Sequence, residues 1–295
     1  MPPSLNSPMD ILLSYAFMQR AFLAGFLISL TCAILGVFLV LRRDAMIGHG
    51  LAHVTFGGVA LGIFLYVAPI LMALGVAVVS ALGILKLKER AGLYGDTAIG
   101  IISSLGMALG IILVSAAGSY NVDLFGYLFG NILAIDPVEV WMSFILALAV
   151  LSAVAIFYQE FVFLTFDSES AKVSGVRVKR LDALMGMLTA VTVVLGMKVV
   201  GILLVSALLV IPAAASLQVA RSFKEAMLIS AALAGMAAFC GLVAAFYLDW
   251  PSSGTIVSIS GVFFLIFYLI RLRCKSPKGG QNVPGSPTDL IKLGE

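Results

Sequence analysis

The only two histidines of the chain, His49 and His53, lie four residues apart in the glycine-rich segment 48–62. On an α-helix, residues i and i+4 lie one above the other on the same face. Two imidazole rings placed in this way can share one metal ion, because neutral imidazole is the commonest metal ligand in proteins. The alternative is a structural pair of hydrogen-bonded interior histidines. The residue pattern alone leaves both interpretations open.

The same spacing occurs in zinc proteases, but their helix carries a glutamate general base directly after the first histidine. That position is Gly50 here, so the pattern argues against an intramembrane metalloprotease. The sequence also lacks a phosphate-binding loop of the form G-x-x-x-x-G-K-[ST]. If the protein moves a substrate at the expense of ATP, we expect another chain to supply the ATPase.

The composition places the histidine pair in a membrane protein. Of the 295 residues, 61% are hydrophobic and only 11% are charged, and the mean hydropathy is +1.12. Soluble domains are about one quarter charged. The three cysteines are widely scattered and indicate no disulfide framework. We therefore expect an all-α fold, a polytopic bundle of transmembrane helices.

A helix that crosses a bilayer needs about 20 apolar residues. About nine segments meet this requirement, with eight as the alternative; they are Ala21–Leu41, Leu51–Val67, Pro69–Leu85, Ala98–Ala117, Val140–Phe157, Ala183–Met197, Val199–Val219, Ala226–Leu248 and Thr255–Ile270. The sixth and seventh would form one helix of about 55 Å at ~1.5 Å per residue, so we expect a break near 196–201. Pro212 should break or kink the seventh span.

The basic residues predict the topology, because Lys and Arg favour cytoplasmic loops. With the N-terminus outside and the C-terminus inside, all of the 18 Lys and Arg residues except Arg20 and Lys198 fall in inside segments. We divide the chain into an N-terminal segment (1–16), a transmembrane domain (17–272) and a disordered cytoplasmic tail (273–295) rich in Pro, Gly and Ser.

Two connections between spans are unusual. The outer segment 118–137 is rich in apolar residues, which predicts either a short re-entrant or interfacial helix or a hydrophobic surface loop. The inner segment 167–175 resembles a short capped helix, with Asp167 as N-cap, Glu169 in the first turn and Gly175 at the C-terminal end. Such a helix is either a simple connector or a docking element for a soluble partner.

Four segments, in order, resemble the membrane permease subunits of bacterial ABC transporters that import zinc, manganese or iron. They are Arg42–Gly62, Tyr127–Leu133 with its Leu-Phe-Gly-Asn-Ile-Leu motif, Phe166–Gly175, and the Gly-Ile-Leu-Leu-Val…Ile-Pro-Ala-Ala stretch at 201–214. The resemblance extends from about Phe17 to Arg271.

The resemblance implies an import permease of the bacterial cell membrane that works as a pair of copies in the lipid bilayer. A cytoplasmic ABC ATPase dimer would drive it and an extracytoplasmic metal-binding protein would feed it. Its cargo would be a divalent metal ion, with no permanently bound cofactor and no nucleic-acid partner. In this family a cytoplasmic coupling helix sits in a groove of the ATPase, which implies that role for Phe166, Asp167, Glu169, Ala171 and Gly175. The alternative is an ATP-independent carrier or channel.

The metal pair of the family, Asp-x-x-x-His, falls on His49 and His53. His53 matches, whereas His49 replaces the usual aspartate, which favours zinc over manganese because imidazole prefers softer metals. Asp44 could complete the coordination, or it could be a cap or a partner of the neighbouring arginines. A site near the membrane midplane would require residues 42–48 to fold into the protein.

Small residues at Gly58 and Gly62 follow the histidines on the same predicted helix. Glycine at this spacing lets a neighbouring membrane helix approach closely. We therefore expect both positions to serve helix packing or to border the pathway, as we expect of Pro212.

Overall fold

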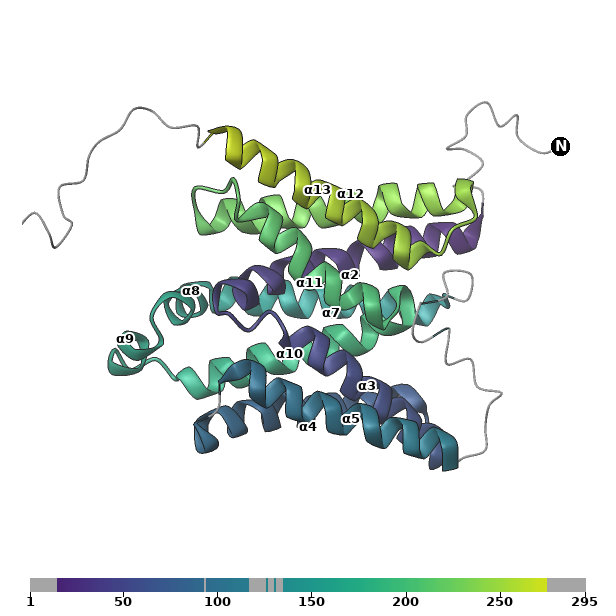
Figure 1. Cartoon of the computed structure of the whole chain (residues 1–295), viewed down its shortest axis with the longest axis horizontal. Coiled ribbons are helices and arrows are strands. Elements are labelled where there is room, and N and C mark those ends of the chain that lie inside the picture. The colour runs from purple at the N-terminus through teal and green to yellow at the C-terminus, as the bar shows by residue number, and fades with distance from the viewer. Residues whose placement is uncertain (1–14, 93, 117–125, 127–129, 131–134, 275–295) are drawn as a thin grey trace, which may run out of the picture.

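A computed structural model describes residues 15–92, 94–116, 126, 130 and 135–274. Within these ranges the regular elements are all helices (Figure 1). They are α2 (Ala16–Leu41), α3 (Ile47–Phe64), α4 (Pro69–Ala91), α5 (Gly95–Ala116), α7 (Pro137–Ile156), α8 (Tyr158–Phe166), α9 (Ser168–Val173), α10 (Val178–Val200), α11 (Ile202–Ser216), α12 (Phe223–Leu248) and α13 (Ser252–Cys274). The prediction of an all-helical, polytopic membrane fold is confirmed.

Eight of the described helices are long and apolar enough to cross a membrane. The ninth predicted span is α11, whose 15 residues extend only about 22 Å at ~1.5 Å per residue. The predicted break between the sixth and seventh spans lies at Gly201, where φ is 91° and α10 ends. Of the two effects predicted for Pro212, a break is wrong, because α11 continues past it to Ser216, and a kink stays a prediction.

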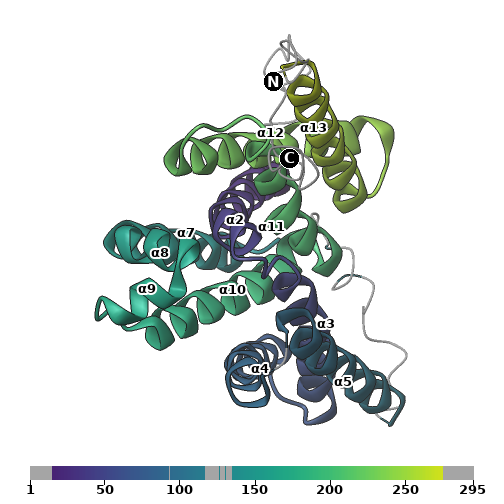
Figure 2. The same cartoon turned by 60° about the vertical axis from the view of Figure 1, so that its left-hand side comes forward.

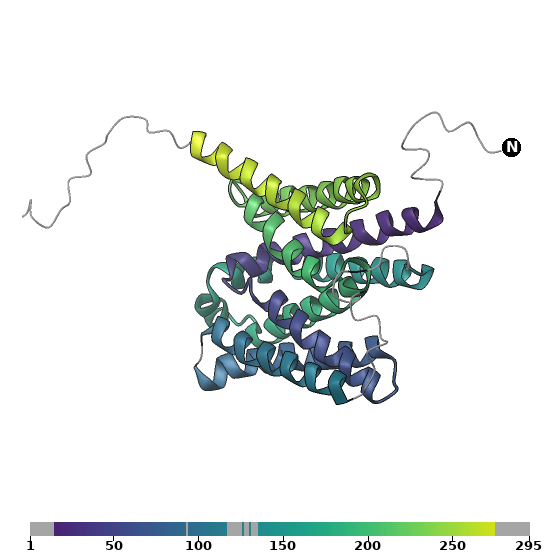
Figure 3. The ribbon, with the colours of Figure 1, turned by 45° about the vertical axis from the view of Figure 1, so that its right-hand side comes forward.

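The helices form a bundle with a buried centre and exposed edges. In the most apolar window of α2 and of α3, 72% of the residues are buried, compared with 17% in α5 and α13. Figure 2 shows α3, α4 and α5 as one group and α12 and α13 at the opposite edge, with α2, α10 and α11 between them. Figure 3 shows α13 at the outer edge beside α12. The histidines therefore lie on a helix that has neighbours on several sides.

Glycines on α3 allow the helices of the first group to approach closely. A Cβ added at Gly58 would lie 2.6 Å from the Cα of Ala73, and one added at Gly62 would lie 2.6 Å from the Cα of Pro69. Both contacts are with α4. On another face of α3, an added Cβ at Gly57 would overlap the carbonyl oxygen of Gly106 in α5. Helix α3 is thus held between α4 and α5 by direct backbone contact.

One end of the bundle carries α8 and α9, and the basic last turns of α4 and α13 lie at this same end (Figure 1). This agrees with the clustering of basic residues from which the N-out, C-in orientation was predicted; the orientation itself stays a prediction. Helix α13 includes Arg273 and Cys274, the first two residues of the segment assigned to the tail; the rest of that segment stays a prediction. Residues 275–295, residues 1–14 and most of the predicted outer helix at 118–137 lie outside the described residues.

Candidate functional site

His49 lies in the first turn of α3 and His53 lies one turn further along. Their Nε2 atoms are 3.1 Å apart, and the rings are nearly perpendicular, with centroids 4.6 Å apart and an interplanar angle of 88°. Two nitrogen ligands of a tetrahedral metal, each at 2.0–2.1 Å, are separated by about 3.3 Å. The separation of 3.1 Å is near the value for a shared ion, and it is also a hydrogen-bond distance between two ring nitrogens, so the geometry fits both interpretations of the pair.

The connection between α2 and α3 leads into the start of α3, the helix that carries this pair. It runs from the α9 end of the molecule back toward the centre before α3 begins (Figure 1). Asp44 and Ile47 are buried along this connection, and the backbone N–H of Ile47 donates to the carbonyl of Asp44 at 3.0 Å. Arg43 and Met46 of the same segment are exposed, so residues 42–48 are buried only in part and the deep site stays a prediction.

The glycines that flank His49 explain how the backbone packs while the imidazole stays accessible. A Cβ at Gly48 would overlap the side chain of Leu209 in α11, and a Cβ at Gly50 would overlap the side chain of Ile99 in α5. These two faces of α3 are closed by neighbouring helices, whereas His49 is exposed and His53 is half-buried. The helix thus presents both rings on its remaining open face.

Asp44 has a different partner from those expected. Its Oδ1 accepts a hydrogen bond from Nζ of Lys88 in α4 at 2.6 Å, while Arg42 pairs with Asp182 in α10. Among the described residues, no group of three or more His, Cys, Asp and Glu side chains is placed to hold a metal. The structure therefore assigns Asp44 to a salt bridge that ties the α2–α3 connection to α4, and leaves the histidines as a pair.

The helix predicted around 167–175 is α9 at the end of the bundle. The Asp167 carboxylate accepts from the backbone N–H and the hydroxyl of Ser170, at 2.9 and 2.6 Å. The hydroxyl bond is the main cause that holds the pKa of Asp167 below its usual value. At the other end, Gly175 has a φ of 84°, and the N–H groups of residues 175 and 176 donate back to the carbonyls of residues 172 and 171. This is a glycine-terminated Schellman end.

The side chains of α8 and α9 divide into an inner and an outer set. Ala171 is fully buried, whereas Phe166 and Val173 are 68% and 89% exposed. Glu169 is also exposed. Single apolar side chains on a surface are ordinary, but here a bulky pair lies beside acidic groups on a rigidly capped turn. Phe166 and Val173, together with Asp167 and Glu169, thus form an exposed surface that is both apolar and acidic.

A cluster of aromatic rings connects α8 to α2 and α12, and the sequence analysis missed it. Phe223 of α12 lies 4.9 Å from Phe38 of α2, 6.0 Å from Tyr158 and 6.1 Å from Phe166, measured between ring centroids. Phe38 in turn lies 5.7 Å from Phe161. The aromatic residues of 158–166, which recur mainly on one helical face, were the signal that could have revealed it.

A second missed feature is a buried ion pair between Lys198, in the last turn of α10, and Glu139, in the first turn of α7. Glu139 is only 3% exposed. Near this pair, an added Cβ at Gly130 would lie 2.6 Å from the carbonyl carbon of Val200, at the α10–α11 break. An ionisable residue within an apolar span was the signal in the sequence.

Comparison with known proteins places this arrangement in context. The model of the ABC 3 transport family matches residues 14–271. The manganese transport system membrane protein MntC of Listeria monocytogenes is 32% identical over 91% of this chain and 94% of its own length. The high-affinity zinc uptake system membrane protein ZnuB of Haemophilus influenzae is 35% identical over 86% and 97%. The structure of PsaBC from Streptococcus pneumoniae in complex with Fab superposes with a TM-score of 0.80 at 30% identity, over 91% of this chain and 98% of that chain.

Proposed function

Because the chain belongs to the ABC 3 transport family, we propose that it is the permease subunit of an ATP-driven importer of divalent manganese or zinc. It is a multi-pass protein of the bacterial plasma membrane. Relatives named for manganese transport and for zinc uptake both align over nearly their whole length, which supports metal import. The chain's role is transport, with ATP hydrolysis carried out by a partner.

The observation that carries the metal assignment is the 3.1 Å separation of the two Nε2 atoms. We assign His49 and His53 as ligands that the ion meets on its way through the bundle. Two protein ligands leave water or other groups to fill the remaining positions, which suits a carrier that must release its cargo. Neutral imidazoles in place of a carboxylate favour zinc over manganese.

Helix α9, with Phe166 beside it, is the surface proposed to dock into the ATPase. Its exposed apolar and acidic side chains would meet the partner, while the buried Ala171 fixes the helix to the bundle. The aromatic cluster around Phe223 would then transmit a displacement of α8 to α2 and α12. A second copy of the permease and an extracytoplasmic metal-binding protein would complete the assembly.

The test is uptake of zinc and manganese into liposomes that contain the permease with its ATPase and binding protein. His53→Ala should reduce uptake of both ions by about tenfold or more, since mutation even of the outer-shell partners of metal ligands typically costs 10- to 100-fold. His49→Asp should raise the ratio of manganese to zinc uptake. Unchanged uptake by His53→Ala would remove the site assignment, and an unchanged ratio in His49→Asp would remove the zinc preference.

The same liposome assay distinguishes the ATP-driven importer from the alternative, an ATP-independent carrier. Replacing Ala171 by a bulky residue should displace α9 and abolish ATP-dependent uptake. If uptake proceeds equally without ATP and with a displaced α9, the chain works as a carrier or channel.

A further inference from the structure

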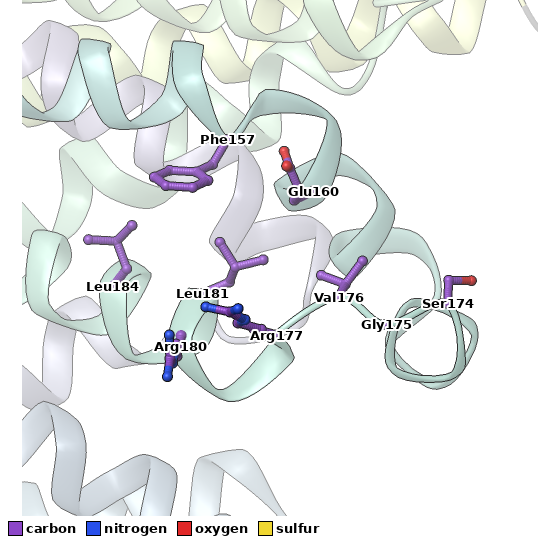
Figure 4. Close-up of a pocket in the computed structure, with 9 residues that line it drawn as sticks. All are labelled: Phe157, Glu160, Ser174, Gly175, Val176, Arg177, Arg180, Leu181 and Leu184. Atoms are coloured by element: carbon purple, nitrogen blue, oxygen red, sulfur yellow. The ribbon is translucent and has the colours of Figure 1, made fainter.

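A groove of about 470 Å³ opens beside α9, between the end of α7, α8 and the first turns of α10. Figure 4 shows its lining side chains. They are Phe157, Glu160, Ser174, Gly175, Val176, Arg177, Arg180, Leu181 and Leu184. None of these residues belongs to the histidine pair or to the aromatic contacts of Phe223; Gly175 is shared with the C-terminal end of α9, and the other eight have no role assigned so far.

The groove lies where two spans leave the apolar zone. Phe157 directly follows the last residue of α7, and Arg177 directly precedes the first residue of α10. Its lining changes along this boundary from the apolar Phe157, Leu181 and Leu184 to polar and charged residues. An occupant that fits must be apolar at one end and polar at the other.

The charged end is shaped for an anion. Among the described residues, neither Arg177 nor Arg180 forms an ion pair with a carboxylate, although Lys179 between them pairs with Glu89 at 2.8 Å. Figure 4 shows the Arg177 guanidinium beside Leu181 and the Arg180 guanidinium lower on the first turn of α10. Guanidinium is always charged, and its planar fork matches phosphate oxygens. Two such groups next to an apolar floor form a receptor for a phosphate that carries a hydrocarbon chain.

The geometry points to an anionic phospholipid of the bilayer as the occupant. Its phosphate would contact Arg177 and Arg180, and one acyl chain would lie along Phe157, Leu181 and Leu184. Basic pockets between membrane helices at the cytoplasmic surface bind anionic headgroups in this way. The Glu160 carboxylate in the same groove favours phosphatidylglycerol, because a carboxylate accepts hydrogen bonds from glycerol hydroxyls.

This site has a consequence for α9. Residues 174–177 line the groove and also form the connection from α9 to α10. A bound headgroup would therefore hold that connection and fix where α9 is presented. The lipid site itself does not depend on metal transport and can be tested without it.

The experiment is native mass spectrometry of the full chain released from membranes containing phosphatidylglycerol or phosphatidylcholine. The wild type should retain phosphatidylglycerol preferentially. The double variant Arg177→Gln/Arg180→Gln should lower that retention about tenfold or more, because it removes both charge-assisted hydrogen-bond donors to the phosphate. Lys179→Gln, which removes one charge from the same turn outside the groove, is the matched control and should retain the lipid.

A second variant controls for loss of lipid binding that is caused by misfolding. Arg177→Lys/Arg180→Lys keeps both charges but loses the forks, and should give retention between those of the wild type and the glutamine variant. Equal retention of both lipids, or an unchanged preference in the glutamine variant, overturns the proposal. So does displacement by millimolar inorganic phosphate, which would indicate a free-phosphate site. If the glutamine variant loses only its association with the ATPase, the groove binds protein and the lipid proposal fails.

Discussion

The buried ion pair between Glu139 and Lys198 allows a test of how the α10–α11 break is held in place. Replacing Lys198 by Met leaves the Glu139 carboxylate, only 3% exposed, with the backbone N–H of Asp136 at 3.3 Å as its remaining hydrogen-bond donor among the described residues. Removing one partner of a buried pair costs about 3–5 kcal/mol. Since the Lys198 side chain is 35% exposed, we expect the lower end, about 3 kcal/mol.

Replacing the other partner of the pair, Glu139, should cost less stability. In Glu139→Gln the lysine keeps its charge and can turn toward solvent, so we expect about 1 kcal/mol. The double variant removes both charges together. Its loss of stability should therefore be well below the sum of the losses in the two single variants. The signature is therefore an asymmetry between the singles and a coupling of about 2 kcal/mol.

The assay is thermal unfolding of the purified protein in one detergent, with metal uptake measured in parallel. At about 2–4 °C per kcal/mol, Lys198→Met should lower Tm by roughly 6–12 °C. Lys179→Met is the matched control on the same helix, because its pair with Glu89 is exposed and should contribute at most about 1 kcal/mol. Equal effects of the two single changes at the buried pair, or additive effects in the double variant, would refute the argument from burial.

Three further predictions concern α9, the aromatic cluster and the packing of α3. Asp167→Ala should speed hydrogen exchange in α9, whereas Asp167→Asn should not. The pKa of Asp167 is lowered in the folded chain, so the stabilisation by the charged cap is fully present above the usual aspartate pKa. It is lost as the pH falls through the lowered pKa of the folded chain. Phe223→Leu should keep the ATPase bound but reduce metal-stimulated ATP hydrolysis severalfold, measured on the assembled complex. Gly58→Ala should lower Tm because its Cβ would lie 2.6 Å from the Cα of Ala73, whereas Gly75→Ala, with nothing within 4 Å, should not.

Each of these predictions has a distinct contrary result. Equal exchange in both Asp167 variants would mean that the cap does not hold α9. Full stimulation in Phe223→Leu would mean that the ring contacts transmit nothing. Equal melting temperatures of the two glycine variants would mean that α3 and α4 can separate without cost.

The sequence was sufficient where periodic or local patterns carry the information. Apolar runs located the spans, because the bilayer imposes their length, and the Asp167 and Gly175 caps located α9. The sequence also required the break at Gly201, because an unbroken helix would exceed the membrane. It could not show that Pro212 lies inside a continuing helix, because proline both ends helices and occurs within membrane helices that neighbouring helices support.

Long-range partners were beyond the sequence for a related reason. Asp44 is close in sequence to Arg42 and Arg43, yet it pairs with Lys88, because the α2–α3 connection turns into the bundle toward α4. Likewise, the contacts of Phe223 with α2 and α8 join residues that are far apart in the chain. Such pairings depend on helix arrangement, which residue spacing does not encode. The histidine pair could be found because both residues lie on one turn of one helix.

The position of Leu209 suggests how a distant helix can act on the histidines. The backbone of Leu209 packs directly against Gly36 of α2, where an added Cβ would overlap it. The side chain of Leu209 packs against Gly48 of α3 in the same way. Phe38, two residues after Gly36, belongs to the aromatic cluster that contacts α8. Because close-packed interiors shift between discrete arrangements rather than deform smoothly, a displacement of α2 must move Leu209 or open a void. Since Gly48 directly precedes His49, Leu209 is the contact through which a displacement of α2 would reach the first turn of α3.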